Sequence, residues 1–179
     1  MIAEQMASRL RHAASSVLER MFMAPVLADQ EFPPPDVASP ILVELEFHGQ
    51  VAGIFALAVA DETARKLALG FMGLGPDEAL DRKTVIEVLG ELANMLCGHF
   101  LGQLQYHDTF RLSTPKEVTL ADHKSKRHSY QRTVHLDHGA LSMEVAVQES
   151  RNRPSPAGSE RPAGFRTPHG LQRKITNRK

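Results

Sequence analysis

The sequence contains one cysteine, no tryptophan and no net charge. Because Cys97 has no second cysteine to pair with in this sequence, an intramolecular disulfide framework is excluded, and a reducing compartment suits the chain. Its longest apolar runs are far shorter than the roughly 20 residues that a membrane span needs. Residues 1–5 show no basic region followed by an apolar one, so we expect no secretory signal. These absences predict a cytoplasmic protein without membrane spans.

The sequence also lacks the motifs of self-contained hydrolytic chemistry. It has no phosphate-cradling glycine loop, no nucleophile elbow and no His-Glu-x-x-His motif. It has no cluster of carboxylates suited to Mg²⁺, and its nine histidines form no zinc-like set with the lone cysteine. We therefore expect no metal site and no cofactor of its own. We also expect Cys97 to be a semi-buried filler rather than a reactive thiol.

Charge is distributed unevenly along the chain. The segment Arg151–Lys179 holds eight of the 21 Lys and Arg residues and one of the 21 acidic residues, which leaves 13 basic and 20 acidic residues before it. An acidic body argues against a nucleic-acid-binding surface on the folded part. The segment itself is rich in Arg, Pro, Gly and Ser and has too few large apolar residues to offset chain entropy. We expect one domain over residues 1–149 and a disordered basic tail over 150–179, or else a tail that contacts an anionic partner.

Hydrophobic spacing predicts an α+β fold, a largely antiparallel β-sheet layered with long helices. Asp61 suits the N-cap of the second helix and Gly73 its C-cap. The methionines at 21, 23, 72 and 95 are interpreted as gap-filling core residues. We expect helices over residues 2–23, 61–72 and 84 to about 106, and strands over 41–47, 51–59, 110–112, 116–120, 129–136 and 140–148.

The most informative stretch is Thr84–Gly98, TVIEVLGELANMLCG, which is periodic and free of proline. At 100° per residue, four residues at spacings i, i+4, i+7 and i+11 gather on the side opposite the apolar stripe. A carboxylate and a carboxamide one turn apart can hold a cation and orient a water together, although a solvated polar face would show the same pattern. A helical glycine costs roughly 1 kcal/mol relative to alanine, so the glycine of this row predicts that another backbone comes close there. The row consists of Glu87, Glu91, Asn94 and Gly98.

This helix and its neighbours along the chain resemble the CheX-like branch of the CheC/CheX/FliY chemotaxis phosphatases. The resemblance covers about residues 10–148, and the order of its elements is more specific than any single one. That family has a glycine-rich hairpin, a helix ending in Met-Gly, a long helix reading Glu-x-x-Asn-x-x-x-Gly, and a Thr-Pro after a short strand. The matching segments here are Phe47–Val51 with Gly53–Leu57, Ala64–Gly73, the GELANMLCG helix and Leu112–Pro115. We interpret Ser113–Pro115 as a strand-ending kink or as a rim beside the long helix.

The resemblance implies a CheC/CheX-like fold and a phosphatase that hydrolyses the aspartyl-phosphate of a CheY-like response regulator. Asn94 would orient the attacking water, and Glu91 would pair with the regulator's active-site lysine. Glu87 and Gly98 would belong to the partner-docking surface, with Glu87 as solvated filler the simpler interpretation. The receiver domain would supply Mg²⁺.

The resemblance further implies a homodimer joined through its sheets. Some relatives carry a second Glu-x-x-Asn on the N-terminal helix, but here Phe22 stands three residues after Glu19, so we expect one site per chain. Two alternatives remain open. One is a non-catalytic CheX-like module that binds a receiver or another signalling partner, and the other is an unrelated α+β interaction domain with a similar pattern.

Overall fold

A computed structural model of the chain describes residues 2–28, 40–104, 109–123 and 128–148. The predicted basic tail at 150–179 lies outside the described residues. The elements are α1 (Ile2–Met21), β1 (Ile41–His48), β2 (Ala52–Val59), α2 (Asp61–Met72), α3 (Arg82–Gly102), β3 (Arg111–Leu112), β4 (Lys116–Val118), β5 (Ser129–Leu136) and β6 (Gly139–Gln148).

The strands form one antiparallel six-stranded sheet with the order β3-β1-β2-β6-β5, in which β4 also pairs with β1. The alternation seen in the sequence sets the two faces of this sheet. Along β1, the side chains of Val43, Leu45 and Phe47 are buried, whereas Glu46 and His48 are exposed. The predicted fold class, α+β with a largely antiparallel sheet, is therefore confirmed.

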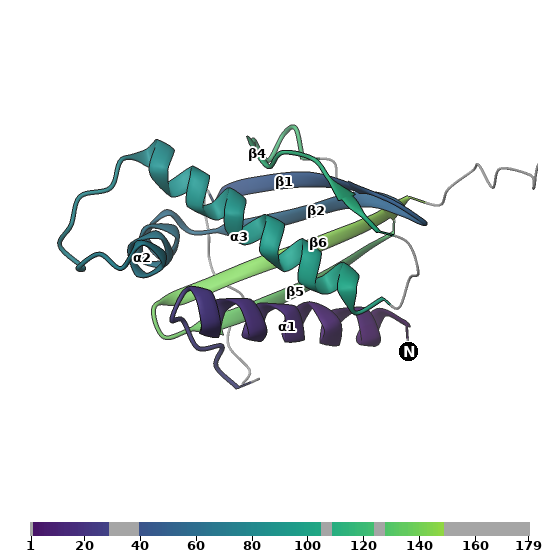
Figure 1. Cartoon of the computed structure of the whole chain (residues 1–179), viewed down its shortest axis with the longest axis horizontal. Helices are drawn as coiled ribbons and strands as arrows, with labels where there is room; N and C mark the ends of the chain where they lie inside the picture. Colours follow the sequence, from purple (N-terminus) through teal and green to yellow (C-terminus); the bar gives the residue numbers. More distant parts are fainter. Residues whose placement is uncertain (1, 29–39, 105–108, 124–127, 149–179) are drawn as a thin grey trace, which may run out of the picture.

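Helices α1 and α3 lie across the same face of the sheet (Figure 1). The third helix packs over β1 and β2, the first over β5, and the two helices contact each other. Their apolar stripes close the core against the strands, because burying both stripes at once removes them from water. The largest fully buried side chains come from both layers: Phe47, Phe55, Phe100, Leu10, Leu18, Leu45, Leu57, Leu67, Leu89, Leu92, Leu96 and Leu141.

Two helix ends differ from the sequence prediction. The second helix starts at Asp61 itself, and its N-cap is Ala60, which has no side-chain cap, so the prediction of Asp61 as N-cap was wrong. The third helix starts two residues earlier than predicted, because the Asp81 side chain accepts a hydrogen bond from the Thr84 N–H. It ends at Gly102 rather than near residue 106. The predicted Gly73 C-cap is confirmed, with a left-handed φ of 68°.

Three of the four methionines interpreted as core are not in it. Met21, Met23 and Met72 are 49%, 78% and 46% exposed, whereas Met95 packs against the core. The helical period could not separate the buried methionine from the exposed ones. The three exposed methionines lie at or beyond helix ends, where no other described element packs over them.

By length and mean hydropathy (1.2), α3 could cross a membrane. More than half of the residues in the apolar stretch of this helix are buried inside the fold, as in a helix that packs into a protein core. Its apolar stripe already has partners in α1, α2 and the sheet.

Candidate functional site on the long helix

The long helix α3 buries one side and presents the other, as its periodicity predicts. Val85, Leu89, Leu92 and Leu96 are buried, together with their neighbours in the core. On the opposite side Glu87, Glu91 and Gly98 are exposed and Asn94 is partly exposed. The two polar groups singled out in the sequence therefore lie one turn apart on an accessible ridge, where a partner can reach them.

The side chains of Glu91 and Asn94 have no polar partner in the described part of the chain. Neither side chain makes a hydrogen bond or an ion pair with any residue that the structure describes, whereas Glu87 lies 3.6 Å from the Lys83 ammonium. An amide and a carboxylate fixed on a rigid helix without internal partners retain their full hydrogen-bonding capacity. They can therefore orient a water molecule and pair with a cation supplied by another molecule.

Thr114 and Pro115 form a second wall beside this ridge, so the ridge is one side of a groove. The groove has a volume of about 250 Å³ and combines residues of α3 with a segment that begins 12 residues after the end of this helix. Its lining consists of Ile86, Glu87, Gly90, Glu91 and Asn94 on the helix, with Thr114 and Pro115 opposite. The interpretation of Ser113–Pro115 as a rim beside the long helix is the one that this geometry favours.

The two glycines of the helix differ in what surrounds them. A Cβ atom added at Gly90 would lie 3.4 Å from Pro115 Cβ, so the helix and the second wall pack directly at this position. A Cβ atom at Gly98 would meet nothing within 4 Å, so within the described chain no backbone comes close there. Sequence reasoning identified Gly98 and missed Gly90 and Ile86. Gly90 could have been identified from the sequence, because it directly precedes Glu91 and lies on the helix between the apolar stripe and the polar row.

Cys97 and the histidines that the structure describes do not line this groove. Cys97 is fully buried, and burial raises the pKa of its thiol to about 12, so it is a filler without thiolate character at neutral pH. Among the described residues, no group of three or more His, Cys, Asp or Glu side chains could hold a metal ion.

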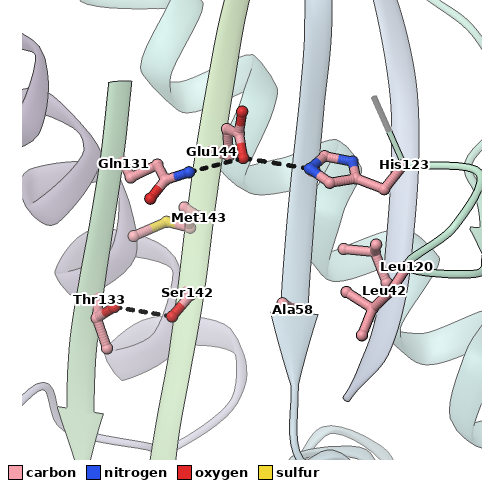
Figure 2. Close-up of a pocket in the computed structure, with 10 residues that line it drawn as sticks. Leu42, Ala58, Leu120, His123, Gln131, Thr133, Ser142, Met143 and Glu144 are labelled. Carbon is pink, nitrogen blue, oxygen red and sulfur yellow. Dashed lines mark hydrogen bonds and ion pairs between the residues drawn. The ribbon is translucent and has the colours of Figure 1, made fainter. Parts of the chain in front are cut away.

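A second cavity of similar size, about 240 Å³, lies on the sheet face that the helices leave uncovered. There His123 contacts two carboxylates from different strands. Its Nδ1 pairs with the Glu44 carboxylate. Its Nε2 lies 3.2 Å from the Glu144 carboxylate (Figure 2). The Gln131 amide donates to Glu144 over 2.9 Å, and Thr133 and Ser142 share a hydrogen bond of 2.8 Å. The polar groups in this cavity are thus paired with one another.

The fold and the ridge together define a class of protein, an α+β domain whose long core helix carries Glu-x-x-Asn on its accessible side. The family model of the chemotaxis phosphatase CheX matches residues 41–138, more than half of the chain. The chain belongs to the CheX family.

Solved structures share this fold at low sequence identity. A CheX chemotaxis protein from Desulfovibrio desulfuricans is 18% identical, with a TM-score of 0.64 over 80% of this chain and 99% of that one. A CheX–CheY–BeF3–Mg²⁺ complex from Borrelia burgdorferi is 23% identical, with a TM-score of 0.60 over 79% and 97%. FliY from Thermotoga maritima is 14% identical, with a TM-score of 0.54 over 79% and 87%. No curated protein matches the sequence significantly.

Proposed function

We propose that this chain hydrolyses the aspartyl-phosphate of a CheY-like receiver domain. The observation that carries the proposal is the accessible Glu91–Asn94 pair, unused by the described fold, at the edge of a groove in a CheX-family domain. A solved complex of a CheX protein with CheY, BeF3 and Mg²⁺ supports a receiver as the kind of partner.

In the proposed reaction, water attacks the phosphorus of the acyl phosphate and the bond between phosphorus and the receiver's aspartate oxygen breaks. The products are inorganic phosphate and a free aspartate carboxylate. Asn94 accepts a hydrogen bond from the attacking water and aligns it with the leaving oxygen, which is the main contribution that positioning makes to phosphoryl transfer. No group of this chain forms a covalent bond to phosphorus.

Glu91 pairs with the receiver's active-site lysine and thereby fixes the register of the helix on its partner. The receiver provides Mg²⁺, which neutralises charge on the phosphoryl oxygens. Glu87 and Gly98 extend the docking ridge on either side of the pair, Glu87 as a weak contributor because its carboxylate is exposed to solvent and lies 3.6 Å from the Lys83 ammonium.

The same proposal includes a homodimer and a cytoplasmic location. The sheet face opposite the helices carries apolar side chains such as Ala52, Ile54 and Ala58 and is the surface through which two copies would join. Light scattering coupled to size exclusion measures the oligomeric state, and a monomer at micromolar concentration would remove this part. The proposed cytoplasmic location follows from the proposed substrate, because the chain must lie in the same compartment as the receiver domain on which it acts.

The test is phosphate release from receiver domains charged with acetyl phosphate, one for each receiver of the same genome. The native chain should accelerate release for at least one receiver. Asn94→Ala should lower that acceleration by about 100-fold or more, while binding to the BeF3-charged receiver changes by less than about threefold. Gln5→Ala removes an exposed amide from α1 and should change neither quantity.

Equal rates for the native chain and Asn94→Ala would remove the enzymatic proposal. Binding of the charged receiver by a native chain that shows no turnover would establish the alternative, a non-catalytic receiver-binding module.

A further inference from the structure

The second wall of the groove is a β-bulge at the outer edge of the sheet. Strand β3 pairs with β1 in a register that sets Leu112 opposite Phe47, and β4 resumes the pairing with Lys116 opposite Glu44. Between these pairs β1 has two residues, 45 and 46, and the outer edge has three, Ser113–Pro115. Because Ser113 pairs with Glu46, residues 114 and 115 both stand opposite residue 45. Two residues opposite one is the definition of a bulge, which bends its strand and redirects its side chains.

This bulge is fixed at both ends. The Ser113 N–H donates to the Glu46 carbonyl over 2.8 Å, and the Ser113 Oγ accepts from the Glu46 N–H over 2.8 Å. Ser113 therefore satisfies both backbone groups of Glu46, with its side chain in place of a backbone carbonyl. At the other end, Arg82 of α3 pairs with Glu117 of β4 over 2.6 Å. Proline at 115 has a fixed φ and no N–H to satisfy, which suits a position that has left the ladder.

The bulge places its two remaining residues against the long helix. Pro115 packs at Gly90, and Thr114 stays exposed while lining the groove that Glu91 and Asn94 also line. Because all these residues share one open groove, a protein surface that brings a phosphoryl group to Asn94 also covers Thr114.

We propose that the Ser113–Pro115 bulge is a second docking element for the receiver domain, with Thr114 as a specificity-determining contact and Ser113 and Pro115 as positioning residues. The inference rests on the proposed function, since it assigns the partner of the same groove. A rigid wall loses little conformational entropy on binding, so its contact strengthens association. Thr114 lies outside the pair that handles water and lysine, so its contact stabilises substrate and transition state equally and acts on KM rather than on kcat.

Substitution of Thr114 tests the contact directly. Thr114→Gln lengthens an exposed side chain without adding charge and should raise KM for the phosphorylated receiver, and Kd for the BeF3-charged receiver, by about tenfold with kcat within about twofold. Thr114→Ser, which keeps the hydroxyl and the small volume, should stay close to native. Ser8→Gln is the matched control, because Ser8 is an exposed small hydroxyl residue on α1, and it should have no effect.

Ser113 tests the positioning role. Ser113→Ala leaves the Glu46 N–H without its acceptor and should raise KM several-fold at nearly constant kcat, and Ser113→Thr, which restores the hydroxyl, should recover it. A purely structural role would lower the melting temperature without the separation of KM from kcat.

The outcomes separate the two proposals. Native KM and Kd for Thr114→Gln, with Asn94→Ala inactive, would overturn the docking element and leave the phosphatase proposal standing. A native chain that binds the charged receiver without turnover removes the phosphatase, and the Kd of Thr114→Gln then decides the docking element alone. A native chain that neither binds nor hydrolyses any charged receiver overturns both.

Discussion

The groove beside α3 and the cavity on the uncovered sheet face are similar in volume, about 250 and 240 Å³, but opposite in the state of their polar groups. On the sheet face, His123, Glu44 and Glu144 are 16%, 18% and 12% exposed and satisfy one another. In the groove, Glu91 and Asn94 are accessible and pair with none of the described residues. Polar groups that pair internally stabilise the fold, whereas polar groups held rigidly without a partner are available to another molecule. The volumes of the groove and the cavity alone would not have shown which of them is available to a partner.

Reversing the charge of Glu91 should have the largest effect on the groove beside α3. Glu91→Lys places an ammonium against the receiver's lysine and should lower kcat/KM by about 100-fold, or about 3 kcal/mol, with the melting temperature nearly unchanged. Glu19→Lys, a charge reversal at an exposed site on α1, is the control. An equal loss in both variants would mean that net surface charge, and not the groove, governs docking.

Gly98 is the open position of the docking ridge, since a Cβ atom there would meet no described residue within 4 Å. Gly98→Ala should stabilise α3 by about 0.5–1 kcal/mol in thermal unfolding, since alanine is the better helix former and no neighbour obstructs its methyl group. If the receiver approaches closely at this point, the same methyl group should weaken binding by about fivefold. Gly102→Ala, also open on the same helix, should leave Kd unchanged.

The sheet face should respond in stability rather than in activity. Burial lowers the pKa of His123, but its hydrogen bonds to the Glu44 and Glu144 carboxylates and the charges of these groups raise it more, so the pKa lies above the ordinary 6.5. A raised folded-state pKa means that this stabilisation is complete below pH 6.5 and is lost as the pH rises through the folded pKa.

His123→Gln removes the cation that joins the two carboxylates. It should lower the melting temperature by about 5 °C at pH 6 and by clearly less at pH 8.5, as expected for a hydrogen bond to a charged group. Thermal scans of both proteins across this range measure the difference. Phosphate release at 25 °C should stay within about twofold of native, and a large loss of turnover would contradict the separation of the two regions.

Glu87 should show the smallest effect. Its side chain is 65% exposed and pairs with Lys83 at 3.6 Å, the geometry of a surface ion pair worth about 0.3–0.5 kcal/mol. Glu87→Gln should change kcat/KM by less than about threefold in the phosphate-release assay. A decrease in kcat/KM as large as that of Glu91→Lys would mean that Glu87 contacts the receiver as directly as Glu91 does.

Local periodicity was sufficient for much of this fold. Alternation along β1 and the 3.6-residue period of α3 predicted which side of each element is buried, including the accessible position of Glu91 and Asn94. The end of α2 at Gly73 followed from local chemistry too. These features depend on residues within a few positions of one another, so a sequence pattern contains them.

Other features depend on contacts between distant segments. The bulge at Ser113–Pro115 is defined by its register against β1, more than 60 residues earlier, and no pattern within the segment reveals it. The contact of Pro115 with Gly90 and the His123 cluster, drawn from a loop and two strands, have the same origin. The exposure of Met21 and Met72 likewise depends on where the packed layers end.

The layered α+β fold and the side of the long helix on which the Glu91–Asn94 pair lies can be derived from the amino-acid sequence, because both follow from the spacing of apolar residues within single elements. The groove beside this ridge and the pairing of His123 with two carboxylates on the opposite face become visible only in the packed structure. Strand register and the meeting of distant segments set these features, and both are properties of the packed chain rather than of any stretch of it.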